Sequence, residues 1–287
     1  NLILKELKSK KKDIADDFNF SQIVTQNKDR LNSVINKLNY IYSLNLKSDV
    51  TGLVFNSLLR GKFEAGEGLG TFLTPEEVVN PVNEMLLLLC CKNNKKINGP
   101  IGDIAGGTGR FLYSLKNKIQ NFQKIQKKFI NSQFYLYDIS NMSVSLAKIN
   151  FYIEKLYPNF FTTKDSLTDI SLNKFKNSFS LLATNPPFGI GKYGFNKNLL
   201  KTFDIKTLKQ INFFKDGQKI DPAELFFIKN IDLLGPEGVL GIVLPDGICK
   251  TEKLNKLLSV FNNRSYYINK IAVISLPSHT FSLGGTV

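Results

Sequence analysis

Histidine and cysteine are scarce in this chain, which limits the kinds of site that it can build. One histidine, His279, and three cysteines, Cys90, Cys91 and Cys249, occur among 287 residues. The cysteines lie in apolar surroundings and have no paired spacing, so neither a metal site nor a disulfide framework is expected. We interpret them as small buried hydrophobic residues in a reducing compartment.

Long apolar runs are also missing. None reaches the ~18 residues that a membrane-spanning helix needs, and residues 1–12 lack the apolar stretch of a secretory signal. We therefore expect a cytoplasmic protein. The chain begins at Asn1 rather than at a methionine and ends at Val287 after Gly-Gly-Thr. We expect it to be a fragment of a longer protein.

Acidic residues are fewer than basic residues. The chain has 24 acidic and 38 basic residues, and its net charge is +14. This excess favours a polyanionic partner such as nucleic acid. An A+T-rich genome would produce the same bias toward lysine and asparagine, so charge alone does not identify the partner. Arginine is rare, which predicts little bidentate reading of guanine and assigns sequence choice to a partner or a missing segment. The four arginines are Arg30, Arg60, Arg110 and Arg264.

Two domains are predicted along the chain. Residues 1–68 are rich in lysine, and their apolar residues recur at three- and four-residue steps, as in Leu31, Val34 and Leu38. This pattern predicts a small helical N-terminal region, which a glycine-rich stretch joins to the remainder. Residues 69–287 form the second predicted domain.

In this second domain, predicted strands and helices alternate. A helix is expected from the Thr-Pro-Glu-Glu of residues 74–77 to about Cys91, because threonine caps helices and proline suits the first helical position. The alternation predicts a doubly wound α/β fold with a Rossmann-like, mostly parallel sheet, whose ligands bind beyond the carboxyl ends of the strands. Strands are expected to end near residues 104, 138, 163, 184, 244 and 276, and helices to cover 111–119, 143–156, 222–234 and 251–261.

A glycine-rich loop, residues 103–112, lies between a predicted strand and a predicted helix. Glycine lets the backbone turn sharply and approach a ligand closely, and the helix start presents free N–H groups to an anionic group. Tight turns of this kind need glycine even without a ligand. A Walker-type phosphate site is disfavoured because no Gly-Lys-Ser/Thr follows.

Asp138 ends the next predicted strand. A carboxylate at this position suits the two hydroxyls of a ribose, as in dinucleotide-binding folds. A solvated loop carboxylate is the alternative. Together with the glycine loop, Asp138 favours a ligand that contains a nucleoside.

Residues 185–188, Asn-Pro-Pro-Phe, close an apolar run. Prolines commonly terminate strands, so a plain turn is one interpretation. The other is catalytic, because adenine N6 is a poor nucleophile whose lone pair is delocalised into the ring. The side-chain oxygen of Asn185 and the carbonyl of Pro186, held rigid by Pro187, can accept hydrogen bonds from both N6 hydrogens. Phe188 offers a face on which a flipped base can stack.

Three segments resemble those of a known family, the N6-adenine DNA methyltransferases. Residues 103–112 resemble its Asp-Pro-x-Cys-Gly-Thr-Gly-Gly-Phe-Leu loop, and residues 185–188 match its catalytic motif. Residues 70–75 resemble the Gly-x-Phe-x-Thr-Pro segment that precedes the loop in one class of the family. The resemblance implies S-adenosylmethionine as the cofactor and methyl transfer to N6 of a flipped adenine.

The resemblance also implies which residues bind the cofactor. Asp103 would meet its methionine amino group and Asp138 its ribose, and Asp165 falls where the family places a carboxylate near its adenine. The remaining implied contacts come from the segment before the loop and from the loop itself: Phe72, Thr74, Pro75, Ala105, Gly107 and Gly109.

Within this family, the chain resembles most the modification subunit of type I restriction–modification systems. That likeness implies double-stranded DNA as the substrate and a specificity subunit as a partner, and it leaves a restriction subunit open. The chain departs from the family pattern at Ile104, Gly106 and Arg110, where the family has proline, cysteine or alanine, and a small residue. The family continues past Thr286 into a last strand, so we expect the second domain to be truncated. The matching segments are 224–227, 233–238, 243–247 and 274–281.

Alternatives to DNA methylation stay open at this point. Asn-Pro-Pro-aromatic also occurs in enzymes that methylate protein glutamines or RNA guanine amines, although the Phe-Leu-Thr-Pro of residues 72–75 argues against both. A degenerate, non-catalytic DNA-binding subunit is a further alternative, which the intact residues 185–188 argue against. Residues 189–221 carry seven lysines, which would either grip phosphates beside a flipped base or form a solvated loop.

Overall fold

The computed structural model of the chain describes Asn36 and residues 74–91, 99–121, 133–153, 160–188, 199–203, 221–262, 271–277, 280 and 281. The chain separates into two compact units, Asn1–Leu69 and Gly70–Val287. Apart from Asn36, which is helical and exposed, all described residues belong to the second unit. The helical structure predicted for residues 1–68 therefore lies almost entirely outside the described residues.

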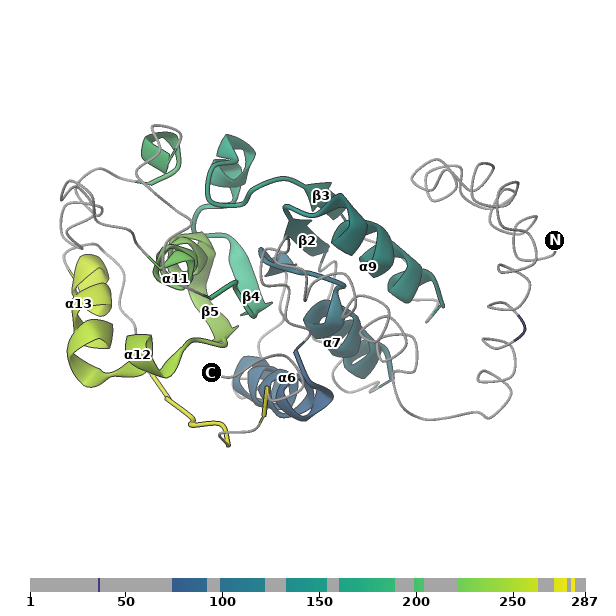
Figure 1. The fold of residues 1–287 in the computed structure, drawn as a ribbon, viewed down its shortest axis with the longest axis horizontal. Helices are drawn as coiled ribbons and strands as arrows, with labels where there is room; N and C mark the ends of the chain where they lie inside the picture. Colours follow the sequence, from purple (N-terminus) through teal and green to yellow (C-terminus); the bar gives the residue numbers. More distant parts are fainter. Residues whose placement is uncertain are drawn as a thin grey trace. The chain divides into compact units, whose positions relative to one another are not determined.

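The described strands of the second unit form one parallel sheet (Figure 1). They are β1 (Ile101–Asp103), β2 (Phe134–Asp138), β3 (Phe160–Thr163), β4 (Phe179–Thr184) and β5 (Leu234–Ile242). The order in the sheet is β3-β2-β1-β4-β5, and each described pairing is parallel. The chain moves outward from β1 to β3 and then returns to the other side of β1. The order therefore reverses between β1 and β4, which is where open α/β sheets bind ligands.

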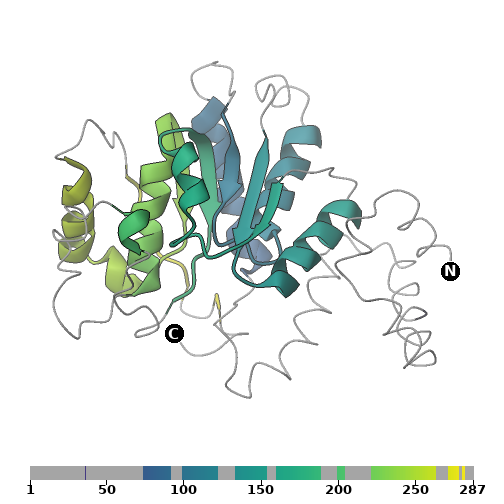
Figure 2. The same cartoon turned by 90° about the horizontal axis from the view of Figure 1, so that it is seen from above.

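Helices cover both faces of this sheet (Figure 2). The α-helices are α6 (Glu76–Cys91), α7 (Arg110–Asn121), α9 (Asn141–Ile153), α11 (Pro222–Leu233), α12 (Asp246–Cys249) and α13 (Thr251–Asn262). Two 3₁₀ helices, η1 (Ile170–Phe175) and η2 (Leu199–Lys201), follow β3 and β4 in the sequence. Helices α6, α7 and α9 contribute to one buried cluster, and α11, α12 and α13 contribute to another.

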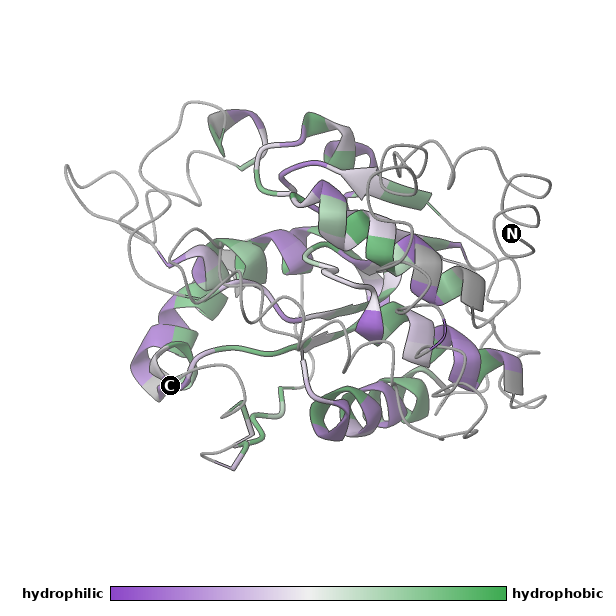
Figure 3. Ribbon diagram, turned by 45° about the vertical axis from the view of Figure 1, so that its right-hand side comes forward, coloured by the Kyte–Doolittle hydropathy of each residue, from purple (hydrophilic) through white to green (hydrophobic). Residues whose placement is uncertain are grey.

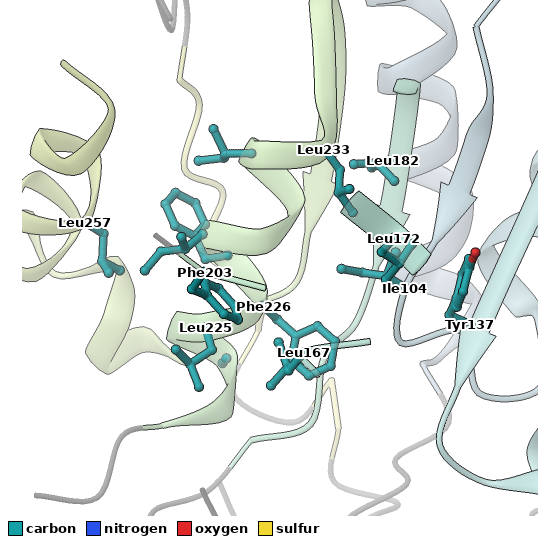
Figure 4. Packing of buried hydrophobic residues seen from close by; sticks show 14 of the residues in the cluster. Ile104, Tyr137, Leu167, Leu172, Leu182, Phe203, Leu225, Phe226, Leu233 and Leu257 are labelled. Atoms are coloured by element: carbon teal, nitrogen blue, oxygen red, sulfur yellow. The ribbon is translucent and has the colours of Figure 1, made fainter. Parts of the chain in front are cut away.

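Successive residues of β4 supply these two clusters. Leu181 belongs to the cluster with α6, α7 and α9, and its neighbour Leu182 belongs to the cluster with α11 and α13. Figure 4 shows the second cluster, in which Phe226 of α11 and Leu257 of α13 lie on the same side of the sheet as Leu182. Because side chains alternate along a strand, a parallel sheet buried on both faces needs apolar residues at consecutive positions.

Local signals account for the start of α11 and for the pattern of the helices. The Asp221 side chain accepts a hydrogen bond from the Ala223 N–H, and Pro222 occupies the first helical position. Along the helices in Figure 3, hydrophobic and hydrophilic residues alternate, as expected of helices with one face toward a core. None of the described helices combines the length and the apolar character that crossing a membrane requires.

The predicted doubly wound α/β fold is confirmed, and with it the strands ending near residues 104, 138, 163, 184 and 244. The prediction of a strand that ends near Leu276 is wrong. Residues 271–277 are described but form no strand, and Ile271, Val273 and Ile274 are 52%, 55% and 58% exposed. A β-branched run becomes a strand only when another strand pairs with it, and no described strand lies against this one. Cys90 and Cys249 are half-buried rather than buried.

Candidate functional site

The carboxyl edge of the sheet carries the predicted site residues. Asp103 and Asp138 are the last residues of β1 and β2, Asp165 follows the end of β3, and Asn185 comes directly after β4. In a parallel sheet these ends lie along one edge, so the fold brings the four polar side chains to the same edge. Phe72 lies outside the described residues.

The glycine loop connects β1 to α7 in a tight turn. The Gly106 N–H donates to the Tyr137 carbonyl at 2.9 Å, and the Gly109 N–H donates to the Gly106 carbonyl at 2.7 Å. Gly107 and Gly109 have φ angles of 50° and 82°, in the left-handed region that favours glycine. A Cβ on Gly109 would lie 3.1 Å from the Cβ of Ala147, whereas a Cβ on Gly107 would meet nothing within 4 Å. Gly107 therefore faces open space, and Gly109 packs against α9.

The carboxyl group of Asp103 is almost fully buried, with 1% of the residue exposed. Burial raises its pKa to about 7 from the ordinary value of 3.8. The Ala105 N–H, which donates to Oδ1 at 3.1 Å, partly opposes this rise in pKa, and the charge of Asp138 adds to it. Burial disfavours the charged form of this carboxyl group. A cationic partner beside it would favour the ionised form, so the site suits a cationic ligand group.

Asp138 holds the loop from the next strand. Its Oδ2 accepts a hydrogen bond from the Gly107 N–H at 2.8 Å, and its Oδ1 accepts one from the Ser140 N–H at 2.8 Å. Burial raises the pKa of Asp138, and these two hydrogen bonds work against the rise. Each carboxylate oxygen keeps a second lone pair for a ligand hydroxyl. Ile139, the next residue, is 51% exposed and adds apolar surface beside Asp138 that the sequence analysis missed.

Asp165 closes the turn that follows β3. Its Oδ1 accepts a hydrogen bond from the Leu167 N–H at 3.0 Å, and its Oδ2 accepts one from the Thr168 hydroxyl at 3.1 Å. The neighbouring Ser166 hydroxyl donates to the Ile104 carbonyl at 2.6 Å and so ties this turn to the end of β1. Asp165 thus has a structural role, and its contact with a cofactor stays a prediction.

Asn185 makes one side-chain hydrogen bond and leaves an acceptor unused. Its Nδ2 donates to the Thr74 hydroxyl oxygen at 2.9 Å. Its Oδ1 is buried and has no hydrogen-bond partner among the described residues. Asn83 Oδ1 and Asn230 Oδ1 are also buried without a partner among the described residues, so what distinguishes Asn185 is its place at the carboxyl edge of the sheet, where ligands bind. The arrangement suits a substrate that donates a hydrogen bond.

The rest of the Asn-Pro-Pro-Phe segment is positioned by packing. Pro186 is buried, and Pro187 and Phe188 are half-buried. Phe188 packs against both apolar clusters, so its ring is held at the edge where the two faces of the sheet meet. Whether its ring stacks on a base stays a prediction.

Thr74 differs from the role that its local sequence predicts. Helix α6 begins at Glu76, and the first turn closes on the Pro75 carbonyl, which accepts from the N–H groups of Val78 and Val79. Thr74 therefore precedes the helix rather than capping it, and its hydroxyl engages Asn185 instead. Pro75 is half-buried beside it, and its predicted contact with a cofactor stays a prediction.

Arg110 is a further site residue whose role the sequence analysis missed. Its Nη1 donates to the Thr74 carbonyl at 2.7 Å, across 36 positions of the chain. A cation in the first turn of a helix is unfavourable to the helix dipole, so this position of the arginine is not explained by the stability of α7 itself. The sequence showed Arg110 only as a departure from the family pattern.

The chain has relatives among known proteins. A family model described as N-6 DNA methylase matches residues 46–283. The type II methyltransferase M.MamI from Microbacterium ammoniaphilum is 29% identical over 151 residues, which are 51% of this chain and 42% of that protein. The type I restriction enzyme EcoEI methylase subunit from Escherichia coli is 26% identical over 261 residues, which are 88% of this chain and 48% of that protein. The chain spans less than half the length of both curated relatives.

Solved structures share the fold. A structure described as a class I S-adenosylmethionine-dependent methyltransferase from Listeria monocytogenes has a TM-score of 0.52 and 21% identity, covering 72% of this chain and 56% of that chain. A cryo-electron microscopy structure of the DrdV–DNA complex has a TM-score of 0.56 and 17% identity, covering 90% of this chain and 30% of that chain. At these identities the likeness bears on the fold alone, and it agrees with the parallel sheet flanked by helices.

Proposed function

Because the chain belongs to the N-6 DNA methylase family, we propose that it transfers a methyl group from S-adenosylmethionine to N6 of a flipped adenine in double-stranded DNA. The observation that carries this proposal is the buried Oδ1 of Asn185, which has no partner among the described residues. An exocyclic amino group is a hydrogen-bond donor of the kind that this atom lacks.

The residues at the edge of the sheet fit the cofactor. The buried Asp103 carboxyl would pair with the amino group of its methionine part, which would offset the burial that raises the pKa of Asp103. Asp138 would accept hydrogen bonds from the ribose hydroxyls. The open space at Gly107 lets a ligand approach the loop backbone, and exposed Ile139 offers an apolar surface to the adenine ring.

The chemistry of this chain's residues follows from the weakness of the nucleophile. N6 of adenine shares its lone pair with the ring, and two acceptors at its hydrogens favour a more tetrahedral nitrogen with a localised pair. Asn185 Oδ1 is one acceptor, and the carbonyl of Pro186 is the natural second, because the rings of Pro186 and Pro187 hold the backbone rigid. Phe188 would stack on the flipped base.

S-adenosylmethionine supplies the methyl group, activated on a sulfonium. In that transfer the nitrogen–carbon bond would form as the sulfur–carbon bond breaks, S-adenosylhomocysteine would be left behind, and the methylated N6 would lose one proton, which reaches solvent when the site opens. The protein contributes mainly by placing the amino nitrogen in line with the methyl group and by excluding water. No covalent intermediate with a side chain is required.

Partners follow from the family and from the charge of the chain. The EcoEI relative is named as the methylase subunit of a type I restriction enzyme. By analogy, we infer that this chain works in a restriction–modification system with a specificity subunit that selects the DNA sequence. The same analogy leaves a restriction subunit open as a further partner. The net charge of +14 suits a DNA substrate.

Labelled methyl transfer tests this function and its alternatives together. The purified full chain, with any subunits that co-purify, would receive S-adenosylmethionine labelled in the methyl group and one of three acceptors. These acceptors are duplex DNA, RNA and a glutamine-containing protein substrate. We expect label in DNA alone, recovered as N6-methyladenine. Label in RNA or protein would show that DNA is not the acceptor. Cofactor binding without transfer to any acceptor would favour a non-catalytic subunit.

A matched pair of variants at Asn185 tests the observation that carries the proposal. Asn185→Leu keeps the shape of the side chain but has no acceptor, and we expect transfer to fall by at least about a hundredfold. Asn185→Asp keeps acceptor oxygens, so we expect a smaller loss. Equal losses in the two variants would show that the acceptor oxygen is not what matters at this position.

A further inference from the structure

Thr74 links Asn185 of the Asn-Pro-Pro-Phe segment to Arg110, which follows the last glycine of the glycine loop. We propose that Thr74, held by Arg110, positions the Asn185 carboxamide for methyl transfer. This inference rests on the proposed function, because it assigns positioning residues to that reaction. Neither residue would touch the base in this role. Both would act through Asn185.

Two hydrogen bonds meet at Thr74. Its hydroxyl oxygen accepts from Asn185 Nδ2 at 2.9 Å, and its carbonyl accepts from Arg110 Nη1 at 2.7 Å. Thr74 is only 6% exposed, so water competes little for either contact. The first bond engages the nitrogen end of the Asn185 amide and leaves Oδ1 for the substrate. The second holds the backbone of Thr74, which precedes helix α6.

The hydrogen bond from Arg110 differs from the hydrogen bonds that join α6 to α7 in the residue that it reaches. Other hydrogen bonds of the described residues also link these helices. They include Asn83 to the Phe111 carbonyl at 3.0 Å, Ser114 to Asn80 at 3.2 Å, and Lys118 to Glu84 at 2.7 Å. These bonds reach residues within α6, whereas the Arg110 bond reaches the residue that contacts Asn185.

The position of Arg110 in its own helix supports the same inference. It is the first residue of α7 and directly follows Gly109, the last glycine of the loop. A positive charge there opposes the helix dipole, an unfavourable local effect that the contacts of Arg110, its hydrogen bond to the Thr74 carbonyl among them, offset. A bond from a charged guanidinium to a carbonyl is among the stronger hydrogen bonds. Arg110 therefore joins the end of the glycine loop to the residue that contacts Asn185.

The inference predicts an effect on the chemical step rather than on binding. If Thr74 loses its hydroxyl, the Asn185 Nδ2 loses its partner and the amide has more freedom to rotate away from the base. An interaction that acts mainly in the transition state lowers kcat with little change in KM. A displacement of about 1 Å at a reacting group can cost roughly a hundredfold in rate.

The first test compares two substitutions of Thr74 in the full chain. Thr74→Val keeps the branched shape and removes the hydroxyl, and we expect a fall in kcat of roughly tenfold to a hundredfold with little change in the KM for DNA. Thr74→Ser restores the hydroxyl and should recover most of the lost rate. Calorimetry with S-adenosylhomocysteine measures cofactor affinity for each variant, so that a loss of the cofactor contact implied for Thr74 is separated from a loss of positioning.

The second test compares Arg110 with a matched cation on the same helix. Lys118 also links α7 to α6, through an exposed ion pair with Glu84 of 2.7 Å. We expect Arg110→Met to lower kcat in the same direction as Thr74→Val, and Lys118→Met to leave it unchanged. Thermal unfolding of each variant separates a loss of fold from a loss of positioning.

Three results would overturn the inference. They are an unchanged kcat in Thr74→Val, an equal loss in Thr74→Ser and Thr74→Val, and equal effects of Arg110→Met and Lys118→Met. If the unmodified chain methylates no adenine, the proposed function fails. A crystal structure of Thr74→Val then decides the positioning by itself. A changed Asn185 side-chain conformation supports it, and an unchanged conformation contradicts it.

Discussion

At the scale of single residues, the buried carboxyl group of Asp103 connects cofactor binding to pH. Burial raises its pKa to about 7, so it is partly protonated near neutral pH. The methionine amino group of the cofactor would pair with the ionised form. Protonation of Asp103 should therefore compete with cofactor binding.

We predict that affinity for S-adenosylhomocysteine, which carries the same amino group, falls by roughly an order of magnitude from pH 7.5 to pH 6. Isothermal titration calorimetry at a series of pH values measures this dependence. In Asp103→Asn the affinity should be weaker at pH 7.5 and nearly independent of pH over this range. A pH-independent affinity of the unmodified chain would contradict the pairing of Asp103 with that amino group.

The same pKa affects folding with a definite sign. The unfolded chain releases the Asp103 proton near pH 3.8, whereas the folded protein keeps it until about pH 7. Between these values the folded state binds more protons, so this group's contribution to stability decreases as pH rises. Relative to the unmodified chain, Asp103→Asn should gain up to about 1.4 kcal/mol of unfolding free energy per pH unit from pH 5 to pH 7. Urea unfolding at these pH values measures the difference, and a constant difference would contradict the raised pKa.

Single residues also show where sequence reasoning was sufficient and where it was not. Asp103, Asp138 and Asn185 could be placed because each follows a recognisable apolar run, and strand ends converge in a parallel sheet. The partner of Asn185 could not be found in this way. Thr74 lies 111 positions away, and its surroundings in the sequence indicate a helix cap rather than a catalytic contact.

At the scale of elements, the loop between β1 and α7 contains two glycines with different surroundings. Both have positive φ, so alanine at either position should cost about 1–2 kcal/mol of backbone strain. A Cβ at Gly109 would also press against Ala147 and Phe151 of α9 at 3.1 and 3.2 Å, whereas a Cβ at Gly107 would meet nothing within 4 Å. Alanine substitutions at the two positions therefore test packing and ligand binding separately.

We predict that Gly109→Ala lowers the free energy of unfolding more than Gly107→Ala does, because it adds a steric contact to the strain. Gly107→Ala should weaken S-adenosylhomocysteine binding, because its methyl group would enter the space proposed for the cofactor. Urea unfolding and calorimetry measure the two effects. Gly247→Ala, where a Cβ also meets open space, serves as the control. Identical stability losses at Gly107 and Gly109 would refute the packing argument.

Elements also mark the limit of pattern-based prediction. The predicted helices over 111–119 and 222–234 match α7 and α11, because capping signals and apolar spacing are local. The run ending near Leu276 has the composition of a strand but no described partner. The composition of the run indicates a preference for extended backbone. A strand also requires a neighbouring strand to pair with, and the sequence of the run does not specify that partner.

At the scale of the whole molecule, the net positive charge and the scarcity of arginine together predict how the chain binds DNA. The net charge is +14, which favours contacts with DNA phosphates whatever the sequence. Four arginines leave little capacity for bidentate reading of guanine. We expect the isolated chain to bind duplex DNA with an affinity that falls steeply with salt and depends little on sequence. Fluorescence anisotropy with several duplexes tests this, and strong sequence preference by the chain alone would contradict the proposed specificity partner.

The most direct test of the central claim is nucleoside mass spectrometry of DNA from a methylation-deficient host. The host would express the full-length protein, with its specificity partner where one is encoded beside it, and a parallel culture would express Asn185→Ala. We predict N6-methyladenine in the first culture and none above background in the second, because the variant lacks the Oδ1 acceptor. An equal signal in both cultures, or no signal in either despite bound cofactor and partner, would contradict adenine methylation through Asn185.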